Sequence, residues 1–297
     1  MSGDFPIVTC PVRGCGLPLD LDSPQGRCAH GHLFDRARSG YFNLLQPQDR
    51  KSRQAGDSRA AVQARQRVLD GGLGDGLRKV LLEAVSAWME IRASDPGGGS
   101  PELPLALDVG CGTGFFLAAL HNELGLPGWG VDLSAAAIDV AAKRYPGCRW
   151  LVANADRKLP FSDGSFDLVL TITSRKNPSE FRRLLRPDGR LIAVVAGGDD
   201  LAELREKILG QDLDKDRAAS TEALFGGLFC LEREFVARDR LYLERPSLVD
   251  LLTSSYRGAR FRAQEKLSRI DGLVVTLSYR LLCFRPASIL TVASTPI

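Results

Sequence analysis

Five residues between positions 108 and 132 have the types and spacing of a nucleotide-binding site. Asp108 lies in an apolar run and is followed by glycines at alternate positions, Gly110, Gly112 and Gly114. Glycines in a turn between a strand and a helix let a ligand approach the backbone, where the helix N-terminus faces it. Asp132 lies 22 residues beyond the first glycine, an offset typical of an acid that binds ribose hydroxyls. This pattern predicts a site for a nucleotide-like ligand.

Four residues near the N-terminus have the chemistry of metal ligands. Cys10, Cys15, Cys28 and His32 have the spacing C-x4-C-x12-C-x3-H. The second pair has ordinary zinc spacing, whereas the first pair is further apart than in the common C-x2-C. Because this segment is too short to bury much apolar surface, a bound metal would have to supply the energy that folds it. We predict a closed structural zinc site; His30 is a rival fourth ligand, and an unliganded loop with buried thiols is the alternative.

The elements that must position the glycine turn alternate between strands and helices. We expect helices after Phe115 and after Ser134, the second with Ser134 as its N-cap. The expected strands are 105–109, 128–132, 149–155, a fourth that follows the loop at 159, a fifth that ends the segment 181–195, and a closing hairpin-like pair, 229–243 and 273–284. This order predicts an α/β fold with a doubly wound sheet.

Three segments resemble class I S-adenosylmethionine (SAM) methyltransferases: D-x-G-x-G-x-G at 108–114, L-P-F-S-D-G-S-F-D at 159–167 and L-L-R-P-D-G-R-L at 184–191. The resemblance implies a Rossmann-like sheet and SAM as the cofactor. It implies that Asp132 binds the ribose and that Asn154 and Ala155 flank the adenine, or Asp156 if the loop is shifted by one residue. The full predicted cofactor set is Asp108, Gly110, Gly112, Gly114, Asp132, Leu133, Asn154, Ala155 and Thr171.

Further segments resemble the RlmA-type 23S rRNA guanine-N1-methyltransferases. They are H-L-F-D-R-A-R-S-G-Y-F-N-L-L at 32–45, S-R-Q-A-G-D-S at 52–58, Q-A-R-Q-R-V-L-D-G-G at 63–72 and A-A-K-R-Y-P at 141–146. The resemblance extends to about Leu209. It implies methylation of a guanine N1 in a 23S rRNA stem-loop, a cleft between the zinc module and the methyltransferase domain, and often a homodimer. The alternatives are a small-molecule acceptor on the same fold and a non-catalytic RNA-binding relative.

The chain departs from that family at three places. Gly74 stands where the family has a tyrosine that reaches the SAM site, and Asp200 stands where it often has a histidine. The segment 171–178, T-I-T-S-R-K-N-P, replaces an I-Y-A-P-C-like sequence. Asp200 is the candidate general base; alternatively it and Asp199 cap the following helix. Arg175 and Lys176, in the altered segment, are either phosphate contacts or solvated surface charge.

Composition and charge frame these predictions. The chain has 297 residues, of which 44% are hydrophobic and 25% charged, as in ordinary soluble proteins. We expect a zinc-binding RNA-recognition module at 1–45, a helical connector with a Pro/Gly linker at 46–100, and the methyltransferase domain at 101–297. The segment 27–67 has a net charge of +6 against +3 for the whole chain. A basic module is the footprint of a polyanion binder, unless the arginines serve solubility.

Cysteine content and hydropathy bear on location. The number of cysteines, seven, is odd and fits reduced thiols better than a disulfide framework. The sequence has no apolar run long enough to cross a bilayer and no signal pattern at its start. We therefore expect a cytoplasmic protein that does not interact with a membrane.

Overall fold

The computed structural model describes residues 8–49, 56–94, 103–209, 217–254 and 265–287. Two sheets form in these ranges. The smaller one contains β1 (Leu19–Asp20), β2 (Gln25–Cys28) and β3 (Leu33–Asp35), which pair antiparallel in that order. The larger one has eight strands in the order β10-β11-β9-β8-β5-β6-β7-β4.

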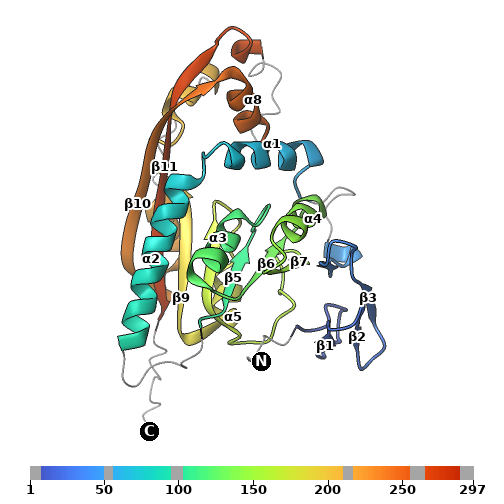
Figure 1. Ribbon diagram of the computed structural model, residues 1–297. Coiled ribbons are helices and arrows are strands. Elements are labelled where there is room, and N and C mark those ends of the chain that lie inside the picture. Colours follow the sequence, from blue (N-terminus) through green and yellow to red (C-terminus); the bar gives the residue numbers. More distant parts are fainter. Residues whose placement is uncertain (1–7, 50–55, 95–102, 210–216, 255–264, 288–297) are drawn as a thin grey trace.

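The larger sheet is parallel except at one edge (Figure 1). Its parallel strands are β4 (Phe42–Asn43), β5 (Ala106–Val109), β6 (Gly128–Asp132), β7 (Arg149–Val152), β8 (Phe166–Ile172) and β9 (Leu185–Ala196). The long strands β10 (Phe229–Glu244) and β11 (Gly272–Pro286) form an antiparallel hairpin, and β11 pairs antiparallel with β9. The doubly wound sheet and its closing hairpin confirm the predicted Rossmann-like fold.

Helices cover both faces of this sheet (Figure 1). The helices of the described residues are α1 (Arg59–Asp70), α2 (Asp75–Ser94), α3 (Phe115–Leu124), α4 (Ala135–Arg144), α5 (Pro178–Leu184), α6 (Ala202–Leu204), α7 (Arg217–Phe225) and α8 (Arg245–Thr253), with a 3₁₀ turn at Pro47–Asp49 and a π-helical turn at Arg205–Leu209. As predicted, Ser134 is the N-cap of α4, and its hydroxyl accepts a hydrogen bond from the N–H of Ala137. No described helix is both long and apolar enough to cross a membrane.

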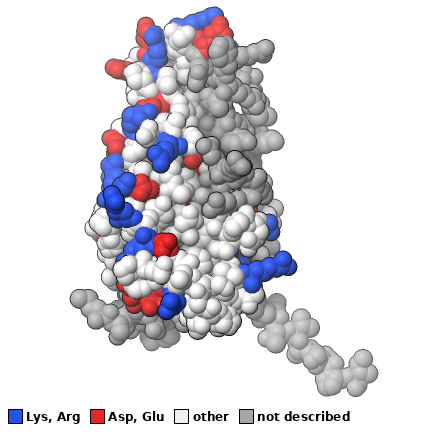
Figure 2. Space-filling view, turned by 90° about the vertical axis from the view of Figure 1, so that its right-hand side faces the viewer, with Lys and Arg blue, Asp and Glu red and all other residues white. Residues whose placement is uncertain are grey.

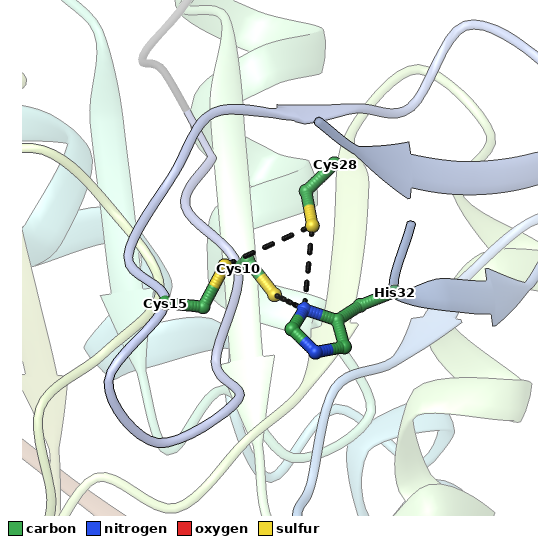
Figure 3. Close-up of side chains that lie close together, drawn as sticks. All are labelled: Cys10, Cys15, Cys28 and His32. Carbon is green, nitrogen blue, oxygen red and sulfur yellow. Dashed lines mark hydrogen bonds between the residues drawn. The ribbon is translucent and has the colours of Figure 1, made fainter. Parts of the chain in front are cut away.

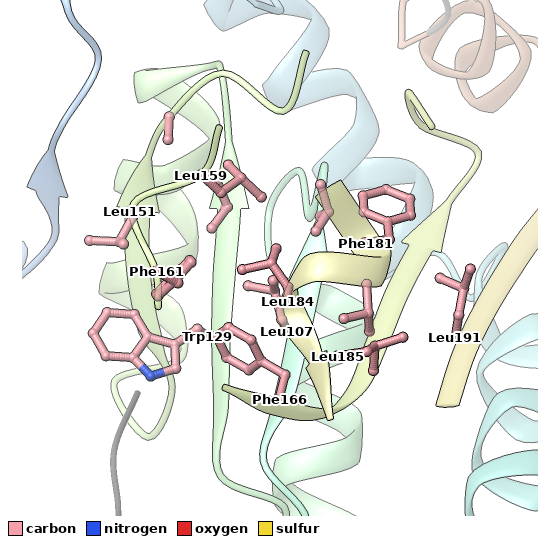
Figure 4. Close-up of a cluster of buried hydrophobic side chains, with 14 of the residues drawn as sticks. Leu107, Trp129, Leu151, Leu159, Phe161, Phe166, Phe181, Leu184, Leu185 and Leu191 are labelled. Carbon is pink, nitrogen blue, oxygen red and sulfur yellow. The ribbon is translucent and has the colours of Figure 1, made fainter. Parts of the chain in front are cut away.

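Burial explains the sequence of the central strands. All seven residues of β8 and all four of β5 are buried, so these strands are nearly continuous apolar runs, as expected when helices cover both faces. One core cluster groups aromatic side chains such as Trp129, Phe161 and Phe166 around the sheet (Figure 4). The rings of Phe161 and Phe166 meet edge to face with centroids 5.0 Å apart, a favoured geometry.

The N-terminal segment is joined to the same core. The strand β4 pairs in parallel with β7, and the N–H of Thr9 donates to the carbonyl of Pro160 over 2.9 Å. Val8 and Phe42 are buried in the cluster that contains Phe161. The region predicted as a zinc module therefore packs directly on the large sheet. The division at residues 45 and 100 stays a prediction.

Candidate cofactor and metal sites

The glycine turn adopts a backbone that requires glycine. Gly110, Gly112 and Gly114 have φ values of 78°, 54° and 79°, in the left-handed region that other residues rarely enter. The turn is anchored to β6, because the N–H of Gly110 donates to the carbonyl of Val131 over 2.8 Å. A Cβ atom at Gly114 would lie 2.3 Å from Cη2 of Trp150. Conformation and packing both exclude a side chain here, which leaves bare backbone at the start of α3.

Asp132 lies at the end of β6, directly beside this turn. Its Oδ2 atom accepts a hydrogen bond from the N–H of Gly112 over 2.9 Å, and its Oδ1 atom accepts one from the N–H of Ser134 over 2.8 Å. Burial raises the pKa of Asp132, and these two hydrogen bonds oppose that shift. A carboxylate offers about four acceptor positions, so Asp132 keeps capacity for two ribose hydroxyls. Its position agrees with the predicted role.

Asp108, at the floor of the turn, is a buried carboxyl group without a complete set of partners. It is 1% exposed, and its Oδ1 atom has no hydrogen-bond partner among the described residues. Burial raises its pKa to about 8, and the negative charge of Asp132 adds to the shift. Buried polar atoms in native proteins are nearly always satisfied. The orphaned oxygen therefore fits a donor carried by a ligand, such as the ammonium group of SAM.

Ser174, in the loop just after β8, contacts the glycine turn. The sequence did not identify this residue as part of the site. The Ser174 hydroxyl donates to the carbonyl of Val109 over 2.7 Å, and a Cβ atom at Gly110 would lie 2.5 Å from it. Thr171, a predicted cofactor residue, is buried and hydrogen-bonds to Ser174 through its hydroxyl over 2.9 Å. Thr173 between them has a φ of 49°, and such strain in a β-branched residue clusters at functional sites.

The remaining predicted cofactor residues lie at the same edge of the sheet. Leu133 follows Asp132 and is half-buried. Asn154 and Ala155 follow β7, which ends at Val152 and is shorter than the predicted strand 149–155. The strand ends early because Asn154 Oδ1 accepts the N–H of Asp156 and turns the chain. The carbonyl of Ala155 accepts a hydrogen bond from Asn177 Nδ2 over 3.1 Å, which connects the loops after β7 and β8.

A segment far from the glycine turn in sequence covers it. In Figure 1, α1 lies above the upper ends of β5 and β6, beneath α8. The Ser134 hydroxyl donates to the carbonyl of Asp57 over 3.0 Å. Arg65 pairs with Asp57, with 2.6 Å between Nη1 and Oδ2, and its Nη1 lies 3.7 Å from where a Cβ of Gly112 would be. Asp57 and Arg65 lie in two of the segments that resemble the RlmA-type family, so the sequence did mark this region as part of the family pattern.

The side chains around Gly74 explain one of the family departures. A Cβ atom at Gly74 would lie 2.9 Å from Cε1 of Phe115 and 2.8 Å from Cδ2 of Leu69. The ring of Phe115, the first residue of α3, thus takes the space beside Gly74. In the altered segment, Arg175 is exposed, and its Nε atom lies 4.0 Å from Oδ1 of Asp156. Lys176 is partly buried, and burial together with the positive charge of Arg217 lowers its pKa. The predicted phosphate role of Arg175 and Lys176 stays a prediction.

Asp200, the third departure, is attached to β11. Its Oδ1 atom accepts the N–H of Ser278 over 3.0 Å. The residue before α6 is Leu201, and α6 has no side-chain cap, so the helix-capping alternative does not describe Asp200. Burial raises its pKa to about 6, and the hydrogen bond from Ser278 opposes the shift. A carboxyl group with that pKa is ionised at neutral pH yet is a better proton acceptor than an ordinary aspartate.

The four predicted metal ligands come together between the first strands (Figure 3). The ligand atoms of Cys10, Cys15, Cys28 and His32 all lie within 4.8 Å of one another. The Sγ atoms of Cys15 and Cys28 are 3.8 Å apart, and His32 Nδ1 is 3.4 Å from the Sγ atoms of Cys10 and Cys28. Zinc–sulfur bonds of about 2.3 Å in a tetrahedron give edges of about 3.8 Å. His30 contacts Cys15 over 3.5 Å but stands outside this set of four.

Family models match both the N-terminal part of the chain and the part that contains the glycine turn. A model described as "RlmA, N-terminal" matches residues 8–53, and one described as "Methyltransferase domain" matches residues 106–189. A Micromonospora griseorubida protein, provisionally named a 23S rRNA (guanine-N1)-methyltransferase, is 30% identical over 294 residues, which are 95% of this chain and 98% of the relative. The Streptomyces fradiae 23S rRNA (guanine(748)-N1)-methyltransferase is 37% identical over 196 residues, 66% of this chain and 65% of that one.

The fold and the glycine turn, together with these matches, define a class I SAM-dependent methyltransferase with a structural zinc ribbon. More narrowly, the chain belongs to the RlmA-type family, in which its relatives are named 23S rRNA (guanine-N1)-methyltransferases.

Proposed function

We propose that this protein transfers a methyl group from SAM to N1 of a guanine in a stem-loop of 23S rRNA. The observation that carries the proposal is the similarity to the M. griseorubida protein over 95% of this chain, zinc ribbon and methyltransferase domain together. A second observation that supports an RNA substrate is that the ribbon carries four exposed arginines: Arg13, Arg27, Arg36 and Arg38. In Figure 2, Lys and Arg side chains lie mainly on the left of the face shown, with others at the top and lower right, and they are mixed with Asp and Glu. Such groups contact phosphates.

The chain's own residues have mainly a positioning task. SAM supplies the methyl group when bound. Asp132 and the glycine turn hold the nucleoside part, and Asp108 receives the ammonium group. Methyl transfer needs the acceptor atom in line with the methyl carbon and the sulfur, in a site from which water is excluded. Ser174 and Thr173, at the end of β8, border the place where the acceptor must enter, because ligands bind at the carboxyl ends of such strands.

Asp200 is the candidate base for the guanine N1 proton. The order β5-β8-β9 places the end of β9 two strands from the glycine turn, or about 10 Å at the usual strand spacing. The carboxylate of Asp200 would accept the N1 proton as the N1–methyl bond forms. We expect Asp200→Asn to reduce the rate of methyl transfer by about 100-fold. The wild-type rate should fall as the pH drops through about 6, because protonated Asp200 cannot accept a proton.

Single-turnover rates between pH 5 and 8, with SAM affinity measured in parallel, test this role. Asp199→Asn is the neighbouring control, because Asp199 pairs with Arg238 at the surface over 2.8 Å. Its rate at pH 8 should match the wild type. Its pH profile should shift to lower pH, since the negative charge of Asp199 contributes to the raised pKa of Asp200. An Asp200→Asn enzyme with the wild-type rate and pH profile would exclude Asp200 as the base.

Primer extension tests the proposed target. Methylation of guanine N1 removes the N–H that pairs with cytosine, so reverse transcriptase should stop at the modified base. We expect one SAM-dependent stop on protein-free 23S rRNA incubated with the enzyme. Methyl incorporation into the RNA without a stop would contradict methylation at N1. A cytoplasmic location follows from a ribosomal substrate and belongs to this proposal, and the homodimer stays a prediction from the family resemblance.

A further inference from the structure

Arg65 of α1 lies on the side of the glycine turn where a ligand is expected. A Cβ atom at Gly112 would lie 3.7 Å from its Nη1 and 4.0 Å from its Cδ. The guanidinium is held from two sides: Nη1 donates to Asp57 Oδ2 over 2.6 Å, and Nη2 donates to the carbonyl of Ser254, after α8, over 2.8 Å. The Arg65 side chain is still 33% exposed. It is therefore a fixed positive charge at the entrance to the turn.

Asp57, the ion-pair partner of Arg65, shows that a carboxylate fits beside the guanidinium. Asp57 is fixed against the loop between β6 and α4, because its carbonyl accepts the Ser134 hydroxyl and a Cβ atom at Gly56 would lie 2.6 Å from the Ser134 nitrogen. The place beside the guanidinium thus already accommodates one carboxylate, which remains 43% exposed. Arginine presents five donors in a planar fork, so Arg65 has donors left for a second carboxylate.

The methionine part of SAM carries two opposite charges. Asp108, with its orphaned buried oxygen, fits the ammonium group. The carboxylate needs a cation or several N–H donors nearby, because an unpaired charge in an enclosed site is costly. Arg65 faces Gly112 and supplies this cation from α1, which is outside the methyltransferase sheet. We propose that Arg65 binds the carboxylate of SAM and thereby makes the site selective for a cofactor that carries this group.

This inference rests on the proposed methyltransferase function only through SAM, and it needs no RNA. The probe is decarboxylated SAM, which keeps the adenosine, the sulfonium and the ammonium but lacks the carboxylate. Dissociation constants for SAM and decarboxylated SAM are measured by calorimetry with the full chain and with Arg65→Ala, Arg65→Lys and Arg67→Ala. Arg67 is the matched control: it lies in the same helix and pairs with Asp250 of α8 over 2.6 Å.

The wild type should bind SAM about 10- to 100-fold more tightly than decarboxylated SAM, the usual range for a charge-assisted contact. Arg65→Ala should lose this preference because its affinity for SAM falls while its affinity for decarboxylated SAM stays the same. Arg65→Lys should keep part of the preference. Binding of decarboxylated SAM to Arg65→Ala within about threefold of the wild type shows that the variant is folded. Arg67→Ala should keep the full preference.

Two results would overturn the proposal. One is equal affinity of the wild-type chain for the two cofactors. The other is an Arg65→Ala variant that binds both cofactors more weakly by the same factor, which would make Arg65 a support for α1 and α8 only. A negative result in the RNA assays would leave this measurement unaffected, since cofactor discrimination is read without an acceptor.

Discussion

Asp132→Ala should weaken SAM binding by at least about 100-fold. The substitution removes the acceptor for two ribose hydroxyls, and hydrogen bonds to a charged group are among the stronger ones. It also leaves the N–H groups of Gly112 and Ser134 without the carboxylate that now orients them, so the glycine turn loses a constraint. Equilibrium dialysis with labelled SAM measures the effect directly.

Asp132→Asn and Asp163→Ala are the controls for this prediction. The asparagine variant keeps one acceptor oxygen, so its SAM affinity should lie between those of the wild type and the alanine variant. Asp163 is an exposed carboxylate that pairs with Arg183 over 2.7 Å, and its loss should leave SAM affinity unchanged. A folded Asp132→Ala protein that binds SAM as tightly as the wild type would show that Asp132 is not the ribose contact.

Removal of zinc should unfold the N-terminal ribbon. Structural zinc in small modules contributes apparent binding energies of about 10–16 kcal/mol, and few residues of β1, β2 and β3 are buried. A chelator, or Cys28→Ser, should therefore expose residues 10–35 to proteases, whereas β4, which pairs with β7, should stay protected. SAM affinity should change little, because the metal cluster contributes no residue to the glycine turn. Methylation of RNA should fall by at least about 100-fold if the ribbon holds the RNA.

Cys230→Ser is the matched control for the zinc prediction. Cys230 is an exposed cysteine of β10 outside the cluster, so its replacement should leave zinc content and protease resistance unchanged. Zinc is counted by metal analysis, and cleavage sites are mapped by mass spectrometry. A ribbon that resists proteases equally with and without metal would contradict a structural role for zinc.

The site residues that the sequence predicts form local patterns, and the structure brings them together. Asp108 and the three glycines lie within seven positions, and Asp132 follows at the end of the next strand, so the strand–turn–helix pattern alone locates them. The zinc ligands are similarly local. The strands from β5 to β11 followed from the alternation of elements along the chain, except that β7 ends before the predicted residue 155, where Asn154 accepts a hydrogen bond from the N–H of Asp156. The short strands β1 to β4 were not predicted.

The features missed from the sequence depend on contacts between distant segments. Ser174 meets Gly110, Arg65 meets Gly112 and Asp200 meets Ser278 only when the sheet has formed. Phe115 beside Gly74 shows the same limit: the sequence revealed that a family tyrosine is missing, but not that a ring from α3 occupies the space. Spacing rules describe neighbours along one element, and they do not say which side chain from another element faces them.

The central claim is tested most directly by identifying the methylated nucleoside. Protein-free 23S rRNA is incubated with the enzyme and SAM labelled in the methyl group, digested to nucleosides and separated by chromatography with mass detection. The account predicts that the label elutes as 1-methylguanosine and that Asp132→Ala yields far less of it at a SAM concentration that only just saturates the wild type. Label in any other nucleoside, or an unlabelled RNA from an enzyme that binds SAM, would contradict it and turn attention to a different acceptor.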